Sequence, residues 1–316
     1  MKVKLFIISV LILIPWWALS QNNLYLKAQV AYEQSDFNAT SNYLNDYLKE
    51  FGSNDKAVFL RAKSNLQLKK YQLVLDDISM LKPGFNDEIL LIKARANAGL
   101  ANSESAIRLL DKYLDSNKKE AEPIILNYPE FQELKANEGW QILWKEERYS
   151  KNEMLLNNAL YAIKSNKIAE AGDRLDELIA RYKRSNEGYY YKGKILFEKK
   201  NYAEALKMFE NALEIEPNNI DYQLEVAKSN VKLKKQKKAI EQFNAIIAND
   251  SLYLPAFLGR AEAYLLNKDY KNAEDDISKF RGYYSQNPEA QFVNAEINSQ
   301  SGDFLSAIST FGKLIK

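Results

Sequence analysis

The stretch EGYYYKGKILFEKKNYAEALKMFENALEIEPNN, residues 187–219, decides the fold of this chain. Its second half places apolar residues three and four apart, which is the spacing of one face of an α-helix. Asn201 precedes that half and can cap its first turn. The apolar face comprises Tyr202, Ala205, Leu206, Phe209, Ala212 and Leu213. With a first helix over the preceding residues, the stretch predicts a pair of antiparallel helices.

The same pattern recurs every 34 residues from residue 152 onward. With Asn186 as position 1, positions 8 and 20 hold small residues and position 24 holds large apolar ones. Only Gly, Ala or Ser lets two helices approach closely, so positions 8 and 20 are expected to meet within a pair. Position 24 is expected to fill the space between neighbouring pairs. In order, position 8 is Ala159, Gly193, Ala227, Ala261 and Ala295, position 20 is Ala171, Ala205, Ala239, Ala273 and Ala307, and position 24 is Leu175, Phe209, Phe243, Ile277 and Phe311.

This pattern resembles that of the tetratricopeptide repeat family, which has the same period and the same alternation of small and large residues. The resemblance is clearest over residues 186–219. It is weaker where Gln223 and Gln291 replace the aromatic residue of position 4, and Pro217 is the one proline kept at position 32. The resemblance implies an all-α fold, an α-solenoid of antiparallel helix pairs (a tetratricopeptide superhelix), whose first helices line a concave groove.

The repeat divides the chain into segments. Residues 21–120 repeat more loosely and predict about three helix pairs, near 21–54, 55–86 and 87–120. Residues 152–316 predict five units, of which the last is truncated. Between them, residues 121–151 break the register. Position 8 of the looser pairs is Ala28, Ala62 and Ala94.

The segment 121–151 is rich in aromatic residues and is interrupted by Pro123, Pro129 and Gly139. It resembles a segment that often closes a bacterial tetratricopeptide array. We expect a cap or joint whose large side chains pack on the third pair. The alternatives are a plain helical linker or a segment that occupies the groove. The side chains in question are Phe131, Leu134, Trp140 and Trp144.

The N-terminus has the three parts of a secretory signal peptide. Lys2 and Lys4 precede an apolar run to Leu19, and small residues lead to a cleavage site between Ser20 and Gln21. We therefore expect an exported protein of the periplasm or cell envelope of a Gram-negative bacterium, or a secreted one. No integral membrane span is expected after cleavage. The alternative is a retained anchor, although the run is shorter than the ~18 residues that a span needs.

Composition excludes several classes of function. The sequence has no Cys and no His, which removes thiol nucleophiles, disulfides, the commonest metal ligand and the commonest general base. No Gly-rich phosphate loop is present. The paired carboxylates Asp76-Asp77 and Asp275-Asp276 are expected to lie on a solvated helix face. We therefore predict no enzyme, no catalytic residue, no metal and no cofactor.

Charge argues against nucleic acid as a partner. Of 44 basic residues, Lys2 and Lys4 leave with the signal peptide, so 42 basic residues face 42 acidic ones. Nucleic-acid binding normally requires a basic excess. The run KLKKQKK, residues 232–238, falls in the turn between the two helices of a pair. It is expected to be a solvated turn, and the alternative is a surface for an acidic partner or an anionic lipid.

Positions 2, 5, 9 and 12 of the first helices share one face because they follow the helical period. Apolar side chains beside sparse charges suit an extended protein segment held by a few anchors. We therefore predict a non-catalytic protein-interaction scaffold or adaptor of the cell envelope that binds a peptide or protein segment in this groove. The alternatives are an oligomeric structural component of an envelope assembly and a carboxylate-based glycan-active enzyme. The predicted groove residues are Tyr190, Lys194, Phe197, Leu224, Lys228, Val231, Leu258, Glu262 and Leu265.

The last unit ends early, at its position 29. Terminal repeats normally need a polar outer face or a cap. We expect Phe292, Phe311 and Leu314 to pack back on the preceding unit, with Ile308 and Ile315 incompletely covered. This end is predicted to dock a partner or a second copy, which would make a homo-oligomer.

Overall fold

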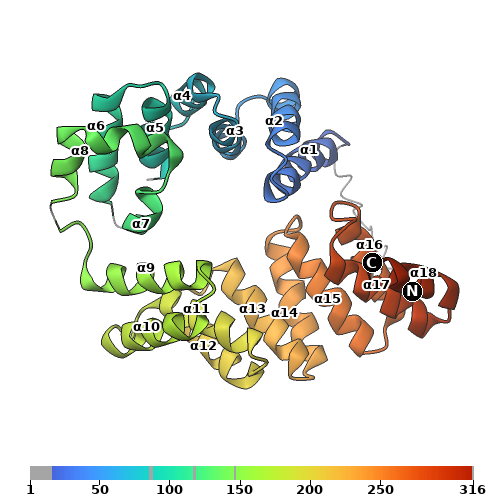
Figure 1. The fold of residues 1–316 in the computed structure, drawn as a ribbon. Helices are drawn as coiled ribbons and strands as arrows, with labels where there is room; N and C mark the ends of the chain where they lie inside the picture. Colours follow the sequence, from blue (N-terminus) through green and yellow to red (C-terminus); the bar gives the residue numbers. More distant parts are fainter. Residues whose placement is uncertain (1–15, 85–87, 117–118, 146, 315–316) are drawn as a thin grey trace, which may run out of the picture. The chain divides into compact units, whose positions relative to one another are not determined.

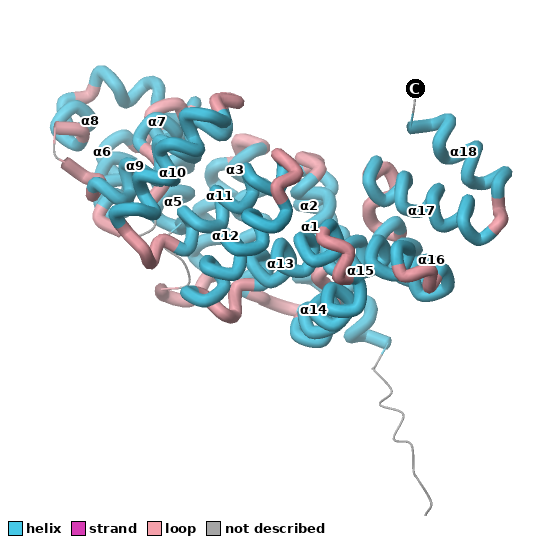
Figure 2. The backbone as a smooth tube through the Cα atoms, turned by 90° about the horizontal axis from the view of Figure 1, so that it is seen from below, coloured by secondary structure: helices cyan, strands magenta, loops and turns pink. Residues whose placement is uncertain are grey.

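The computed structural model describes residues 16–84, 88–116, 119–145 and 147–314. These residues form helices joined by turns, and no strand occurs among them (Figure 2). The predicted all-α fold is thus confirmed. The helices (Figure 1) are α1 (Trp16–Glu33), α2 (Phe37–Phe51), α3 (Asp55–Gln67), α4 (Tyr71–Ser79), α5 (Glu88–Gly99), α6 (Ser103–Leu114), α7 (Glu122–Ile125), the 3₁₀-helix η1 (Pro129–Ala136), α8 (Glu138–Leu143), α9 (Lys151–Lys164), α10 (Ile168–Arg181), α11 (Asn186–Glu198), α12 (Tyr202–Ile215), α13 (Ile220–Lys232), α14 (Gln236–Asn249), α15 (Leu254–Leu266), α16 (Tyr270–Arg281), α17 (Pro288–Ser301) and α18 (Phe304–Leu314).

The chain forms two compact units, residues 1–96 (unit 1) and 97–316 (unit 2). In unit 1, α1 packs on α2, α2 on α3 and α3 on α4. In unit 2, every helix from α9 to α17 packs on the one that follows, and α15 also contacts the first helices α13 and α17 of the neighbouring pairs. Unit 2 is therefore an α-solenoid in which antiparallel helix pairs stack one on the next.

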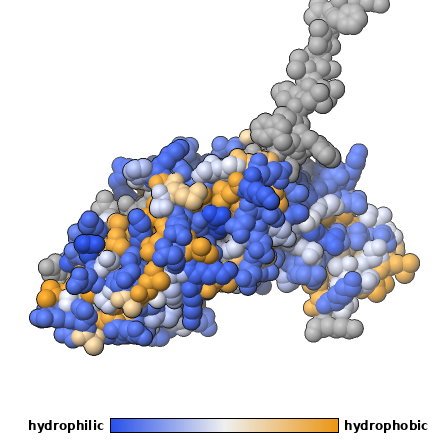
Figure 3. Space-filling model, turned by 90° about the horizontal axis from the view of Figure 1, so that it is seen from above, coloured by the Kyte–Doolittle hydropathy of each residue, from blue (hydrophilic) through white to orange (hydrophobic). Residues whose placement is uncertain are grey.

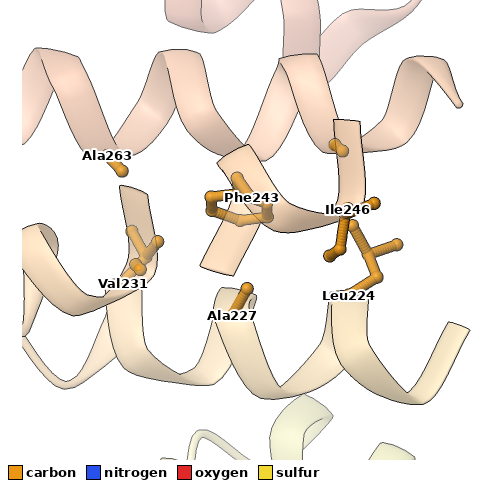
Figure 4. Packing of buried hydrophobic residues seen from close by; sticks show 8 residues of the cluster. Leu224, Ala227, Val231, Phe243, Ile246 and Ala263 are labelled. Carbon is orange, nitrogen blue, oxygen red and sulfur yellow. The ribbon is translucent and has the colours of Figure 1, made fainter. Parts of the chain in front are cut away.

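The predicted packing positions are buried. The alanines of position 8, and those of position 20 up to Ala273, are wholly enclosed, and Ala307 is 3% exposed. Large rings fill the remaining gaps. A Cβ atom on Gly193 would lie 2.6 Å from the Phe209 ring, and one on Gly259 would lie 2.5 Å from the Phe243 ring. Each of these phenylalanines thus occupies the place of a missing side chain. Figure 4 shows Phe243 among its neighbours from three helices.

The turn inside each pair uses a left-handed residue at position 15. In unit 2, Lys200, Lys234 and Lys268 have φ angles of 61°, 60° and 62°. After Lys200, the next amide donates to the Leu196 carbonyl at 2.9 Å, which closes the end of α11 as in a Schellman motif. The same conformation recurs at Ser35, Lys69, Ala101 and Asn166.

The prediction of a solvated face for the paired carboxylates is wrong for one residue of each pair. Asp77 and Asp276 are buried, at 4% and 6% exposure. A helical turn directs adjacent side chains about 100° apart, so only the first residue of each pair reaches solvent. Each buried carboxylate receives an arginine from the first helix of its own pair. The contacts are Arg61 Nε to Asp77 Oδ1 at 3.1 Å, and Arg260 Nε and Nη2 to Asp276 Oδ2 and Oδ1 at 2.6 and 2.7 Å.

Each arginine also reaches the preceding helix pair. Arg61 Nη1 donates to Asn45 Oδ1 on α2 at 2.8 Å, and Arg260 Nη1 donates to Asn244 Oδ1 on α14 at 2.6 Å. One guanidinium therefore ties three successive helices. We call this arrangement the arginine clamp, and among the described residues both units contain it, at the same repeat positions.

The aromatic segment packs against both of its sequence neighbours. Helix α8 contacts α6, and α7 contacts α9. Phe131 and Trp140 are buried, with ring centroids 5.4 Å apart, whereas Trp144 is only partly buried. The hydroxyl of Tyr149 donates to the Glu120 carbonyl at 2.7 Å. These contacts suit a joint that links α6 to α9.

The predicted signal peptide lies largely outside the described residues, which begin at Trp16 in α1. The predicted cleavage site, between Ser20 and Gln21, falls inside α1. Among the described helices, none is both long enough and apolar enough for a membrane span.

Candidate functional site

The predicted groove residues lie on α11, α13 and α15, the first helices of three successive pairs in unit 2. Side-chain contacts link these helices into one surface. The rings of Tyr190 and Tyr222 have centroids 5.0 Å apart, and Lys194 Nζ lies 3.3 Å from Glu225 Oε1. Farther along, Tyr253, which precedes α15, donates its hydroxyl to Asp221 Oδ1 at 2.6 Å. We call this surface the first-helix face; its side chains are Tyr190, Lys194, Phe197, Asp221, Tyr222, Glu225, Lys228, Tyr253, Leu258, Glu262 and Leu265.

Tyr190 is the aromatic centre of the first-helix face. Its ring centroid lies 5.2 Å from that of Tyr191 and 6.0 Å from that of Phe209, in addition to its contact with Tyr222. Burial, followed by the negative charges of Glu225 and Asp221, raises the pKa of Tyr190 to about 12. Its hydroxyl therefore keeps its proton at any physiological pH and can donate a hydrogen bond to a ligand.

Two further tyrosines are held by hydrogen bonds. Asn186 Nδ2 donates to the Tyr222 hydroxyl at 3.3 Å. Burial raises the pKa of Tyr222, and the charges of Glu216 and Glu187 add to the effect. Burial also raises the pKa of Tyr253, and its hydrogen bond to Asp221 acts in the same direction. Both phenols are consequently neutral and fixed in position.

Glu225 is a buried carboxylate at the middle of this surface. Its side chain is 6% exposed, and Oε1 lies 3.3 Å from Lys194 and 3.7 Å from Lys228. The second oxygen, Oε2, is enclosed and has no hydrogen-bond partner among the described residues. A buried carboxylate oxygen without a donor is costly, so this atom is a point where a ligand or a rearranged lysine gains free energy.

The remaining charged side chains of the face contact residues of neighbouring helix pairs within unit 2. Lys232 Nζ lies 2.5 Å from Glu262 Oε1, which joins α13 to α15. Lys228 Nζ lies 5.7 Å from the Phe197 ring centroid. These pairs are partly exposed, so they are weak and can exchange partners with a bound segment.

Seven of the nine predicted groove residues keep exposed surface. Leu224 and Val231 do not: they are 8% and 1% exposed and belong to the core between α13, α14 and α15 (Figure 4). The reason is helical spacing, since they lie three residues before and four after Ala227, which faces α14. Both are therefore corrected from groove residues to core residues.

Sequence reasoning missed Glu225, Asp221 and Tyr253. No residue-type pattern distinguishes a buried glutamate from the many exposed ones of a polar helix face. The signal that was present is the pairing of Lys194 and Lys228 with a carboxylate at position 6, which only the stacking of α11 on α13 reveals. Among the described residues, no group of three or more acidic side chains is arranged to hold a metal ion.

The C-terminal end exposes apolar side chains. Leu305 and Ile308 are 83% and 68% exposed, which agrees with the prediction for Ile308, whereas Ile315 lies outside the described residues. The expected packing of Phe292 is only partial, because it is 51% exposed and its ring contact is with Phe311 at 5.8 Å. Hydrophobic surface is visible at the right-hand end of Figure 3, where the last helices lie.

Several known proteins resemble this chain. Residues 18–77 match the family described as anaphase-promoting complex, cyclosome, subunit 3. The DnaJ homolog subfamily C member 3 homolog of Dictyostelium discoideum is 37% identical over 98 residues, which are 30% of this chain and 20% of that protein. Human DnaJ homolog subfamily C member 7 is 33% identical over 91 residues, 28% and 18% of the two chains. This chain thus spans about a fifth of the length of these relatives.

Two solved structures are also similar to this chain, at low identity. A tetratricopeptide repeat protein from Parabacteroides merdae is 14% identical and covers 94% of this chain and 92% of its own, with a TM-score of 0.45. MamA from Desulfovibrio magneticus RS-1 is 19% identical and covers 53% of this chain and 94% of its own, with a TM-score of 0.46.

The family model described as tetratricopeptide repeat matches residues 187–219, the same stretch from which the repeat frame was derived. The helix pairs on either side of it keep the 34-residue period and bury the small residues of positions 8 and 20. Residues 187–219 are thus a tetratricopeptide repeat, and the helix pairs around them repeat its pattern.

Proposed function

We propose that this protein is a non-catalytic scaffold or adaptor of the bacterial cell envelope, and that it holds a segment of a partner protein on the first-helix face. Proteins of this repeat family bind other proteins, and unit 2 has the stacked helix pairs that such binding uses. The observation that carries the proposal is the buried carboxylate of Glu225 with its unpartnered oxygen, set among tyrosines and lysines.

The chemistry of the face favours a protein segment over a small metabolite. Neutral phenols donate and accept hydrogen bonds, and their rings offer flat apolar area at little cost in side-chain entropy. The charges alternate in sign along α11, α13 and α15, which suits a ligand that extends across several helices. A compact ligand would need one deep cavity, whereas these contacts are distributed over three helix pairs.

Site-specific crosslinking tests where the partner binds. A photoreactive amino acid at Lys194 or Leu258, both on the first-helix face, is expected to crosslink the same partner in living cells. The matched control is Lys207, which is exposed on α12. Equal crosslinking of that partner from Lys207 would refute the assignment to the first-helix face.

Substitutions test which groups contribute. Tyr190→Phe removes one hydroxyl and keeps the ring contacts with Tyr222 and Phe209, so melting should change little. The double variant Tyr190→Phe with Lys194→Ala is expected to bind the partner roughly 10- to 100-fold more weakly, because it loses one to two anchoring contacts. Lys207→Ala is the matched control. Unchanged affinity for the crosslinked partner in the double variant would exclude these anchors.

The proposed location rests on the tripartite N-terminus. N-terminal sequencing of the protein from a periplasmic or envelope fraction is expected to begin at Gln21. Recovery of the chain with Met1 in a membrane fraction would favour a retained anchor instead.

The absence of catalysis rests on the lack of His and Cys in the sequence. Glycan turnover by the purified protein that disappears with Glu225→Gln would overturn this part of the proposal and leave the fold assignment intact.

A further inference from the structure

The two edges of unit 2 differ in charge. The turns inside the first four of its five helix pairs, at repeat positions 13–19, form seven-residue windows that hold eleven lysines and four acidic residues; the turn of the fifth pair, 300–306, holds no lysine and one acidic residue. The corresponding windows at the other ends of the helices hold two basic and five acidic residues. The first set of windows is 164–170, 198–204, 232–238 and 266–272, and the second is 182–188, 216–222, 250–256 and 284–290.

The four lysine-rich windows lie on one edge of unit 2. Helices α9, α11, α13 and α15 are the first members of successive antiparallel pairs, so they run in the same direction and end on the same side. The turn that follows each of them therefore lies on that side. We call the lysines of these windows the lysine edge. The run 232–238 is its densest part and is continued by the turns before and after it.

Most of this charge is unneutralised. Lys232 pairs with Glu262 at 2.5 Å, and Lys167 lies 3.9 Å from Glu170. The other nine lysines of the edge have no carboxylate within ion-pair distance among the described residues, and all nine are exposed. An array of free cations along one edge creates a local positive field even though the whole chain is nearly neutral.

The backbone conformation of the turns does not require lysine. Lys200, Lys234 and Lys268 occupy the left-handed turn position in three successive pairs. Gly adopts this conformation without strain and Asn tolerates it well, as Asn166 does in the first pair. Lysine at three consecutive sites of this kind points to a use for its charge.

The identity of the cations indicates the partner. Every basic residue in the four windows is lysine and none is arginine. Arginine suits fixed, two-pronged contacts with carboxylates in a protein interface, whereas lysine is a mobile point charge. The charges also extend over four pairs, on the order of 30 Å at the usual spacing of packed helices. Leu266, 49% exposed, adds an apolar side chain in the last window.

We propose that the lysine edge binds the surface of an anionic lipid bilayer. A bilayer presents dispersed negative charge that many separate lysines can meet at once, without the shape matching that an acidic protein would require. In this arrangement the ends of the helices meet the headgroups, and the first-helix face, which runs along the helices, stays open for a protein partner. The inference does not depend on the proposed function.

Cosedimentation with vesicles tests the proposal. The full purified chain is mixed with vesicles of phosphatidylglycerol and phosphatidylcholine, or of phosphatidylcholine alone, at 50 and 500 mM salt. We expect strong preference for the anionic vesicles at low salt and its loss at high salt. The readout is the ratio between the two vesicle types, because an apolar N-terminal segment would bind both.

The triple variant Lys200→Gly, Lys234→Gly, Lys268→Gly removes charge where Gly fits the backbone, so it should fold as well as the natural chain. Its partition onto anionic vesicles is expected to fall on the order of 100-fold. The control triple variant Lys183→Gln, Lys207→Gln, Lys313→Gln removes the same charge from exposed lysines outside the edge. It is expected to bind nearly as the natural chain does.

Three results would overturn the proposal. The natural chain could show no preference for anionic vesicles, or both triple variants could lose binding equally, which would reduce the effect to net charge. The third result is binding to soluble polyglutamate with no binding to vesicles, which would identify an acidic protein as the partner of the edge.

Discussion

Gly193→Ala is the sharpest test of the packing. In an isolated helix this change stabilises by about 1 kcal/mol, because Ala has the higher helix propensity. Here the new Cβ would lie 2.6 and 2.7 Å from two carbons of the Phe209 ring, whereas carbon atoms normally pack at roughly 3.5–4.0 Å. The ring must therefore move by about 1 Å.

Phe209 has no room for that movement. Its side chain is wholly buried in a cluster with Ala205, Leu206 and Val226. Overpacking of a filled core costs about 1–3 kcal/mol, which exceeds the propensity gain. We expect the free energy of unfolding to fall by about 1–2 kcal/mol, measured by urea unfolding followed by circular dichroism.

Gly172→Ala is the matched control. Gly172 is also a buried residue inside a helix, α10, but a Cβ there would meet only the flexible end of Lys192, at 3.8 Å. This variant should be more stable by about 1 kcal/mol. Adding Phe209→Leu should relieve part of the loss in Gly193→Ala, since the pair 152–185 combines Ala159 with Leu175. The reasoning fails if both glycine variants shift stability in the same direction, or if the double variant shows no coupling.

Three further predictions concern other parts of the molecule. Arg260→Ala leaves the buried Asp276 without its ion-pair partner. Because the Arg260 side chain is 17% exposed, we expect this variant to lose about 2–3 kcal/mol of stability and Arg260→Lys to lose about 1 kcal/mol. Equal losses of the two variants in urea unfolding would argue against the clamp. The raised pKa of Tyr190 means that the folded state keeps a proton that the unfolded chain loses near pH 10. The stability that this residue contributes should therefore be fully present below pH 10 and be lost as the pH rises through about 12, and the loss should be smaller in Tyr190→Phe. Unfolding curves that coincide at pH 9 and pH 11 would contradict this. Leu305→Ser with Ile308→Ser should convert any dimer formed through the C-terminal end to a monomer in sedimentation equilibrium, and a dimer that survives both changes would place its interface elsewhere.

The repeat frame could be predicted from sequence because close approach of two backbones restricts residue type strongly. Ala205 and Ala239 are small because two helices approach closely at these positions, and this requirement recurs in every repeat. The same rule placed Phe209 and Phe243 between pairs. The rule could not predict which glycine each ring contacts. Gly259 lies in the helix pair that follows Phe243, so its distance to the Phe243 ring depends on how the two pairs stack.

The polar part of the site could not be predicted in the same way. Burial of Glu225, Asp77 and Asp276 depends on which basic residue a neighbouring helix directs toward each carboxylate. A helical period places a carboxylate on a face, and the angle between successive pairs then decides whether that face is covered. Leu224 and Val231 show the same limit, because the packing of α13 against α14 and α15 decides whether positions near Ala227 become core or surface.

The arginine clamp has a mechanical consequence. In a linear array, separation usually starts wherever two neighbouring pairs hold each other least firmly. Arg260 connects α15 to α14 through Asn244 and to α16 through Asp276, so opening the junction near residue 250 must break the Arg260–Asn244 hydrogen bond, while the Arg260–Asp276 ion pair stays within its own helix pair. When the chain is pulled from its C-terminus, α17 and α18 should detach first, and the force should then rise at this junction before the next pair is released.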